Sequence, residues 1–283
     1  MEEEIYVILF LSPPFLAIFY FLIEGVVTMW DFIKENGQAF KTGIAIMFAI
    51  VAFVLLYLAY KYEKRTKNGV SPVKKMAATS ILATLSIILY YFIKIPINLI
   101  LPFMPGFFDI HFSSVPIYIG GFMFGPLTGA LITVLRMLAK LPGTSTAGVG
   151  ELADFIIGLM TVLVSSFIYH RHKTKKGSIV SLASSVGVWV IVALIANWLF
   201  ILPFYITLFS FETVYAMLAI IPGITRDNYM LYYLLIAVIP FNLIISSLNS
   251  LITFLVYKRV SIAYDNFGFF ENQVKKEIDN NKE

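Results

Sequence analysis

The sequence predicts an all-α integral membrane protein in which a six-helix core follows two extra N-terminal transmembrane helices. Of its 283 residues, 59% are apolar and 13% are charged. Several apolar runs reach the roughly 20 residues that cross a bilayer as a helix. Lysine and arginine fall in short stretches beside these runs, as the positive-inside rule describes. We therefore expect a multi-pass protein of the cell membrane, surrounded by the lipid bilayer, with no nucleic-acid partner despite its formal net charge of +4.

The apolar runs divide the chain into three parts. Residues 1–70 are expected to form an accessory hairpin and a basic loop, and Ser12-Pro13-Pro14 interrupts the first span. Residues 71–262 form a six-helix membrane domain, and residues 263–283 form a polar cytoplasmic tail. The expected spans are 5–23 and 42–60 in the hairpin, then 76–95, 115–124, 127–141, 151–169, 178–203 and 229–257 in the core.

The uncharged turn Gly125-Pro126 sets the predicted topology. If this turn is cytoplasmic, the basic cluster 170–176 is also cytoplasmic, and both chain termini lie on the cytoplasmic side. Residues 94–114, 142–150 and 204–228 then become outer loops. The pair His170-x-His172 lies in the basic cluster, so we interpret it as a topology signal and expect no metal site.

The outer stretch 142–158 places hydroxyls, glycines and two acids between apolar runs. Gly148 and Gly150 allow a tight turn or the close approach of a ligand. Glu151 begins the next helix and shares a face with Asp154. Two interpretations stay open, an acidic helix start that complements the helix dipole and a ligand-binding loop.

Amide side chains recur in the last two core spans. Asn242, Ser246 and Asn249 form one polar stripe at helical spacing, and Asn197 lies toward the outer end of the preceding span. Amides within a membrane are kept off the lipid. These residues either bond one helix to another or line a pocket for a polar, uncharged or heterocyclic ligand.

The first outer loop contains Asp109, His111 and Ser113, which suggest a hydrolase. No third orienting group accompanies them, so catalysis is the weaker interpretation. The same loop is long enough to fold back as a lid. Four aromatic residues in it suit a lid that stacks on a flat ligand, namely Phe103, Phe107, Phe108 and Phe112.

Arg136 and Lys140 are four residues apart near the outer end of their span. Arg136 could neutralise Glu151 or Asp154 or meet an acidic group of a ligand. Extension of these side chains to the interface is the alternative that we favour from the sequence. Small side chains gather in the first core span, at Ala78, Thr79 and Ala83. This face either packs internally or receives another membrane subunit.

In the order in which they occur, several segments give the chain a family resemblance. Residues 71–260 resemble the substrate-binding S component of energy-coupling factor (ECF) vitamin transporters, and most closely its riboflavin-binding type. The segments that carry the resemblance are Phe112-Ser113 with Pro116, Gly120–Gly129, Ser145–Ala153, Asn197-Trp198, Leu202-Pro203, Ile239–Leu243 and Leu255–Arg259.

The resemblance implies a binder, and not an enzyme, that takes up riboflavin or a related flavin from the extracellular side. A transmembrane coupling subunit and two cytosolic ATPases would drive uptake, so ATP is used by the partners and this chain holds no cofactor. The small-residue face of the first core helix would contact the coupling subunit. The residues expected to bind substrate are Asp109, His111, Ser113, Thr146, Gly148, Glu151, Asn197, Tyr205, Asn242 and Ser246.

Some positions depart from the usual residues of the riboflavin-binding type. His111 and Ser114 replace aspartates, Asp154 replaces asparagine, and Ile245 replaces lysine. Three alternatives therefore stay open. The chain is an S component for another vitamin or heterocycle, an intramembrane enzyme that uses Glu151, Asp154 and His111, or a scaffold that only assembles other membrane proteins.

Overall fold

The computed structural model describes residues 37–65, 71–144 and 148–266. The predicted span 5–23 and most of the predicted tail lie outside these residues. The chain divides into two compact units, residues 1–49 and 50–283, and each is considered by itself. The described part of the first unit is helical.

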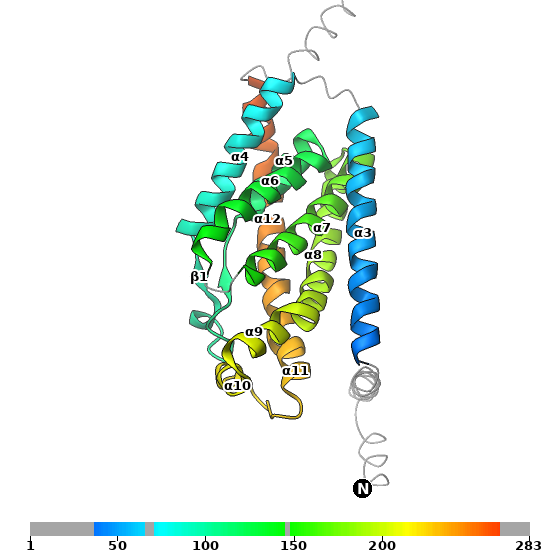
Figure 1. Ribbon diagram of the computed structural model, residues 1–283. Helices are drawn as coiled ribbons and strands as arrows, with labels where there is room; N and C mark the ends of the chain where they lie inside the picture. The colour runs from blue at the N-terminus through cyan, green and yellow to red at the C-terminus, as the bar shows by residue number, and fades with distance from the viewer. Residues whose placement is uncertain (1–36, 66–70, 145–147, 267–283) are drawn as a thin grey trace, which may run out of the picture. The chain divides into compact units, whose positions relative to one another are not determined.

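The described residues are mostly helical, and the helices of the second unit run alongside one another (Figure 1). The elements are α3 (Gly37–Arg65), α4 (Pro72–Phe92), β1 (Ile95–Pro96), β2 (Asp109–Ile110), α5 (Ser114–Phe124), α6 (Pro126–Lys140), α7 (Val149–Arg171), α8 (Lys175–Ala196), α9 (Leu202–Phe209), α10 (Phe211–Leu218), α11 (Tyr229–Tyr232) and α12 (Ile239–Asn266).

Within the described residues, four helical stretches are long and apolar enough to cross a membrane. They are Pro72–Phe92, Val149–Arg171, Lys175–Phe209 and Tyr229–Val260. Each includes most of a span expected from the sequence. The helices α5 and α6 are shorter, with 11 and 15 residues. The chain is therefore a helical, multi-pass membrane protein.

The corner between α5 and α6 depends on glycine. Gly125 has φ 112°, which L side chains rarely adopt, and Pro126 begins α6. The predicted break at this turn is confirmed. Beside it, a Cβ on Gly129 would lie 2.5 Å from Val162 Cγ2 and 3.1 Å from Gly121 Cα. The absence of side chains at Gly121 and Gly129 lets α5, α6 and α7 pack closely.

Two long helices contain π-helical turns that end beside a proline. The turn Asn197–Ile201 precedes Pro203, and the turn Tyr233–Val238 precedes Pro240. Proline lacks an N–H and its ring crowds the carbonyl four residues earlier, so the helix is widened before it. The sequence predicted both spans as helices but not these turns.

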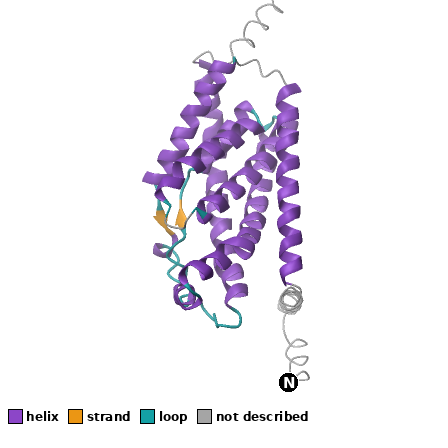
Figure 2. Cartoon of the chain, viewed as in Figure 1, coloured by secondary structure: helices purple, strands orange, loops and turns teal. Residues whose placement is uncertain are grey.

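The predicted outer loop 204–228 is corrected by the structure, because much of it is helical. The helix that contains α8 continues through α9 to Phe209, and α10 follows after Ser210, which has φ 72°. Within this segment Val214 and Leu218 of α10 are buried, whereas Leu208, Phe209 and Met217 are exposed. In Figure 2 the two short strands and the loop that joins them lie toward the same end of the unit as α9, α10 and α11 of Figure 1.

The small-residue face of α4 packs within the chain. Ala78, Thr79 and Ala83 are 0%, 5% and 4% exposed, and both alanines belong to a cluster with residues of α5 and α6. This burial agrees with the internal-packing alternative. The alternative that this face receives another membrane subunit stays a prediction.

Candidate functional site

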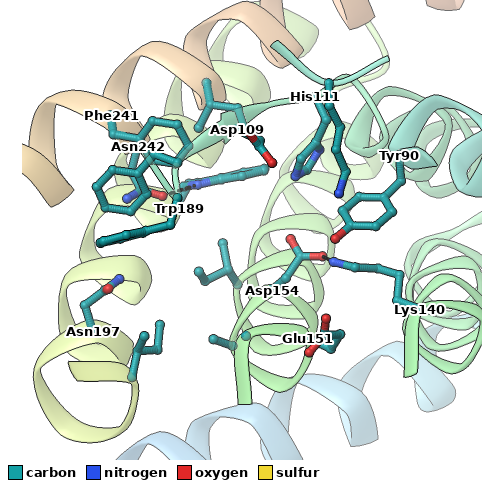
Figure 3. Close-up of a pocket in the computed structure, with 18 of the residues that line it drawn as sticks. Tyr90, Asp109, His111, Lys140, Glu151, Asp154, Trp189, Asn197, Phe241 and Asn242 are labelled. Carbon is teal, nitrogen blue, oxygen red and sulfur yellow. Dashed lines mark hydrogen bonds and ion pairs between the residues drawn. The ribbon is translucent and has the colours of Figure 1, made fainter. Parts of the chain in front are cut away.

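A cavity of about 400 Å³ opens where α4, α6, α7, α8 and α12 meet the loop 93–113. Its lining combines aromatic rings, two amides and several charged groups (Figure 3). The lining residues are Tyr90, Lys94, Phe107, Phe108, Asp109, His111, Lys140, Gly150, Glu151, Ala153, Asp154, Ile157, Trp189, Asn197, Ile201, Tyr205, Tyr233, Phe241, Asn242 and Ile245.

Aromatic rings form one wall of the cavity. The Phe108 ring stacks on Phe241 at 4.4 Å between centroids and lies nearly parallel to Tyr233 at 6.2 Å. Trp189 lies on the same side of the cavity as Phe241 in Figure 3. Phe108 comes from the loop, whereas the other three rings come from helices, so the loop contributes directly to the wall. Such a wall suits a flat ligand.

Two amides are held within this wall by hydrogen bonds between helices. Trp189 Nε1 donates to Asn242 Oδ1 at 2.9 Å, and the Tyr233 hydroxyl donates to Asn197 Oδ1 at 2.6 Å. Each amide nitrogen also donates to the carbonyl four residues earlier, at Val238 for Asn242 and Ala193 for Asn197. An amide has two donor hydrogens and two acceptor lone pairs, so capacity for a ligand remains. These asparagines therefore both bond one helix to another and line the cavity, the two alternatives that the sequence left open.

The opposite wall is charged and centres on Asp154. Its Oδ2 atom lies 2.9 Å from Arg136 Nη2 and 2.8 Å from Lys140 Nζ. The interpretation that Arg136 and Lys140 extend to the interface is wrong, because they are only 1% and 4% exposed. Gly158 leaves room for the guanidinium, since a Cβ there would lie 3.2 Å from Arg136 Nη2.

Tyr90 links this charged wall to the loop. The Lys140 and Lys94 ammonium groups lie 3.9 and 4.3 Å from the centre of its ring, and His111 meets the same ring edge-on at 5.3 Å. A tyrosine face attracts cations through its quadrupole. The ring therefore holds both lysines near the cavity.

His111 is buried and fixed by its neighbours. Arg136 Nη1 donates to Ser113 Oγ at 2.7 Å, and we assign the Ser113 hydroxyl as donor to His111 Nδ1 at 3.0 Å. Asn249 Nδ2 donates to the His111 carbonyl at 3.0 Å. Burial, the largest cause, and the nearby Arg136 lower the pKa of His111 to about 3, against the opposing effect of Asp154. The imidazole is therefore neutral near pH 7.

Glu151 lies in the first turn of α7, where the helix dipole favours an acid. Thr144 Oγ1 donates to its Oε2 atom at 2.8 Å and accepts from the Gly148 backbone N–H at 2.9 Å. Gly148 has φ 86°. It shapes the turn before α7 and does not itself line the cavity.

The cavity brings together six of the ten predicted substrate-binding residues: Asp109, His111, Glu151, Asn197, Tyr205 and Asn242. Ser113 is buried behind His111, and Ser246 is buried in α12, where its hydroxyl donates to the Asn242 carbonyl at 2.6 Å. Thr146 lies outside the described residues. Of the predicted aromatic lid, Phe107 and Phe108 line the cavity, whereas Phe103 and Phe112 do not.

Sequence reasoning missed Tyr90, Trp189 and Tyr233. All three lie in apolar runs, where they resemble ordinary core or lipid-facing residues. Their polar ring atoms are the available signal, because a buried Trp or Tyr usually needs a hydrogen-bond partner. Each partner is an amide of the other of the last two spans, Asn242 for Trp189 and Asn197 for Tyr233.

A helical membrane domain that encloses a cavity lined by rings, amides and ion pairs has the features of a small-molecule binding protein. Residues 74–257 match the family model of the ECF transporter substrate-specific component, which is more than half of the chain. The chain belongs to this family, and the resemblance seen in the sequence is confirmed. The family is a substrate-binding component of a transporter and not an enzyme.

Characterised relatives agree with this assignment. The chain is 28% identical over 197 residues to the riboflavin transporter RibU of Staphylococcus aureus (strain TCH60). This match covers 70% of this chain and 95% of the relative. It is 32% identical over 136 residues to the riboflavin transporter FmnP of Bacillus subtilis (strain 168), covering 47% of this chain and 69% of the relative. A solved S component of a bacterial ECF transporter shares 26% identity and a TM-score of 0.51, with 68% of this chain and 97% of that chain covered.

Proposed function

We propose that this chain binds riboflavin or a related flavin in the cavity and presents it for uptake. The observation that carries the proposal is the pairing of an aromatic wall containing two amides with a charged wall around Asp154. A three-ring heterocycle would lie against Phe108 and Trp189. The amides of Asn197 and Asn242 would bond its polar edge, and the hydroxylated chain would extend toward the charged wall.

The cavity opens on the extracellular side under this proposal. It lies where α4 ends and where α7 begins. The opposite ends of these helices carry basic residues, Lys74 and Lys75 in the first turn of α4 and the cluster 170–176 where α7 ends. Basic residues favour the cytoplasmic side, which supports a cavity on the extracellular side and both termini on the cytoplasmic side.

The proposed partners are a transmembrane coupling subunit and two cytosolic ATPases. The family assignment supports this proposal, because a substrate-specific component is one part of a larger transporter. The chain itself would hold no cofactor, and ATP would be used by the partner ATPases during uptake.

Titration of the purified chain with riboflavin tests the proposal. Of its three tryptophans, only Trp189 lines the cavity among those described, so its fluorescence should change on binding. Asn242→Ala should weaken binding by about tenfold or more, because a buried hydrogen bond to the ligand is lost. Asn98→Ala is the matched control, since this amide is exposed and outside the cavity. Saturable binding that Asn242→Ala and Asn98→Ala affect equally would contradict the proposed site.

Another flat heterocycle is a second candidate ligand, favoured by one observation. Ile245 and His111 line the cavity where the riboflavin-binding type usually has lysine and aspartate. Mass spectrometry of the small molecule that copurifies with the chain distinguishes the candidates. A copurified molecule without a flavin ring, together with no fluorescence response to riboflavin, would replace the flavin with that molecule.

A further inference from the structure

The second half of α3 belongs to the same compact unit as the cavity, which includes residues 50–283. Its burial is periodic. The partly or fully buried positions are spaced as one stripe of a helix, whereas Phe53 and Tyr57 are 73% and 56% exposed. The members of the stripe are Ala52, Leu55, Leu56, Ala59, Tyr62 and Glu63. A helix surrounded by lipid on all sides would not show this pattern.

The stripe packs against α6 and α7. Ala59 is 0% exposed and shares a cluster with Ala130 of α6 and Leu163 of α7. The Tyr62 ring meets the Phe167 ring of α7 edge-on at 6.3 Å. Small and aromatic side chains thus fit α3 to one lateral face of the unit.

Glu63 adds a polar contact at the end of the stripe. Its Oε1 atom accepts from the backbone N–H groups of Leu127 and Thr128 at 2.8 and 3.2 Å, and its Oε2 atom forms an ion pair with Lys75 of α4. The Glu63 side chain is only 9% exposed. A carboxylate at a helix N-terminus is favoured by both the free N–H groups and the helix dipole.

The start of α6 is shaped to receive this carboxylate. The N-cap residue of α6, Gly125, has no side chain to accept from the free N–H groups of this helix, and Pro126 has no N–H. A Cβ on Gly125 would lie 2.6 Å from Glu63 Oε1, so a larger residue there would displace the carboxylate. In sequence, Glu63 is an isolated acid among Lys61, Lys64 and Arg65. The cap on α6 explains an acid at this otherwise basic position.

We propose that residues 50–65 are an integral helix of the substrate-binding unit, fixed by Glu63, and that they stay docked during transport. The face of α6 and α7 beneath them is then closed to partner subunits. The docking itself does not depend on the proposed function, whereas its persistence during transport rests on that function.

Disulfide crosslinking tests the docking, because the chain has no cysteine of its own. The pair Ala59→Cys/Ala130→Cys should crosslink under mild oxidation in the full-length chain. The pair Phe53→Cys/Ala130→Cys is the matched control and should not, because Phe53 points away from the stripe. Equal crosslinking of the two pairs would overturn the proposal.

Substitutions of Glu63 and Lys75 distinguish the contribution of the α6 cap from the contribution of the ion pair. Glu63→Ala should slow crosslinking of the first pair by about fivefold or more, as expected for a lost cap. Glu63→Gln should slow it less, because its carbonyl oxygen still accepts, and Lys75→Gln should have the smallest effect. If Glu63→Ala crosslinks at the rate of the parent pair, Glu63 does not fix the helix.

Riboflavin uptake by the complete transporter tests whether residues 50–65 stay docked during transport. Membrane vesicles that contain the partner subunits should accumulate riboflavin equally whether the Ala59→Cys/Ala130→Cys chain is oxidised or reduced. Uptake that stops on oxidation and returns on reduction would show that α3 must leave, which overturns the proposal. Absence of riboflavin uptake by the cysteine-free chain as well would instead contradict the proposed function, and the crosslinking result would still decide the docking.

Discussion

At the scale of single residues, Asp154 is the carboxylate that pairs with the two buried cations of the charged wall. One of its oxygens serves both Arg136 and Lys140, and both cations are almost fully buried. A charge removed from water is tolerated only when it is paired and hydrogen-bonded. The sequence indicated that Arg136 could meet this acid, but it could not show that the side chains turn inward, because the same spacing also suits extension to the interface.

Replacing Asp154 tests this balance. We expect Asp154→Asn to destabilise the chain by about 3–5 kcal/mol, because it leaves two buried cations without their carboxylate. The melting temperature in detergent is the measurement. The matched control is Glu212→Gln, since the ion pair of Glu212 with Arg226 is more than 60% exposed on both sides. It should cost less than about 1 kcal/mol. Similar losses for both variants would contradict the role of Asp154.

The buried neutral state of His111 predicts a pH dependence. The pKa falls from 6.5 to about 3 in the folded chain, so below pH 6.5 the unfolded state binds a proton that the folded state does not. The free energy of unfolding is therefore unaffected by protonation of His111 above pH 6.5, and it decreases as the pH falls from 6.5 toward 3. His111→Gln should flatten the melting temperature against pH in this window, and His172→Gln, at an exposed position, should not. A slope unchanged by His111→Gln would contradict this prediction.

At the scale of elements, prolines and glycines determine how the helices present the cavity. The two π turns begin at Asn197 and Tyr233, and these residues bond to each other across the cavity wall. π turns occur frequently at functional sites. Pro203 and Pro240 were visible in the sequence, but a proline can kink, end or widen a helix, so the exact register of Asn197 and Tyr233 was not predictable.

Close packing of α5, α6 and α7 predicts a large effect of one methyl group. Gly129→Ala should destabilise the chain by about 1–3 kcal/mol, because its Cβ would meet both Val162 and the Gly121 backbone. Gly187→Ala in α8 is the matched control, since nothing lies within 4 Å of a Cβ there. It should leave stability unchanged or raise it, because alanine favours a helix interior over glycine. Thermal unfolding compares the two variants, and an equal effect would contradict close packing at Gly129.

At the scale of the whole molecule, the apolar runs and loop charges predicted most of the helices. They did not predict the helices within 204–218, because the span 178–203 before them already exceeds the roughly 20 residues that cross a bilayer. The sequence suggested a domain boundary at residue 70, where the basic loop ends, and this stays a prediction. The compact units of the structure divide between residues 49 and 50, within α3. The second half of α3 buries a single face, which its apolar sequence did not predict.

Two truncations test this boundary. A chain that begins at residue 50 should melt near the temperature of the full-length chain and bind riboflavin equally, because the second unit is complete. A chain that begins at residue 71 should melt at a lower temperature, since α6 loses the Glu63 cap and α7 loses the cover of Ala59. Equal melting temperatures for the two truncated chains would place the functional boundary at residue 70 after all.

The stack of Phe108 between Tyr233 and Phe241 also bears on the rates of binding. The ring comes from the loop 93–113, yet it occupies part of the wall that a flat ligand would contact. A ligand that stacks on Phe241 in place of Phe108 would move this ring, and the loop with it. Association of such a ligand should then be slower than diffusion allows, and its departure should involve the same movement of the loop. A slow exchange of this kind suits a chain that must retain its ligand until its partners act.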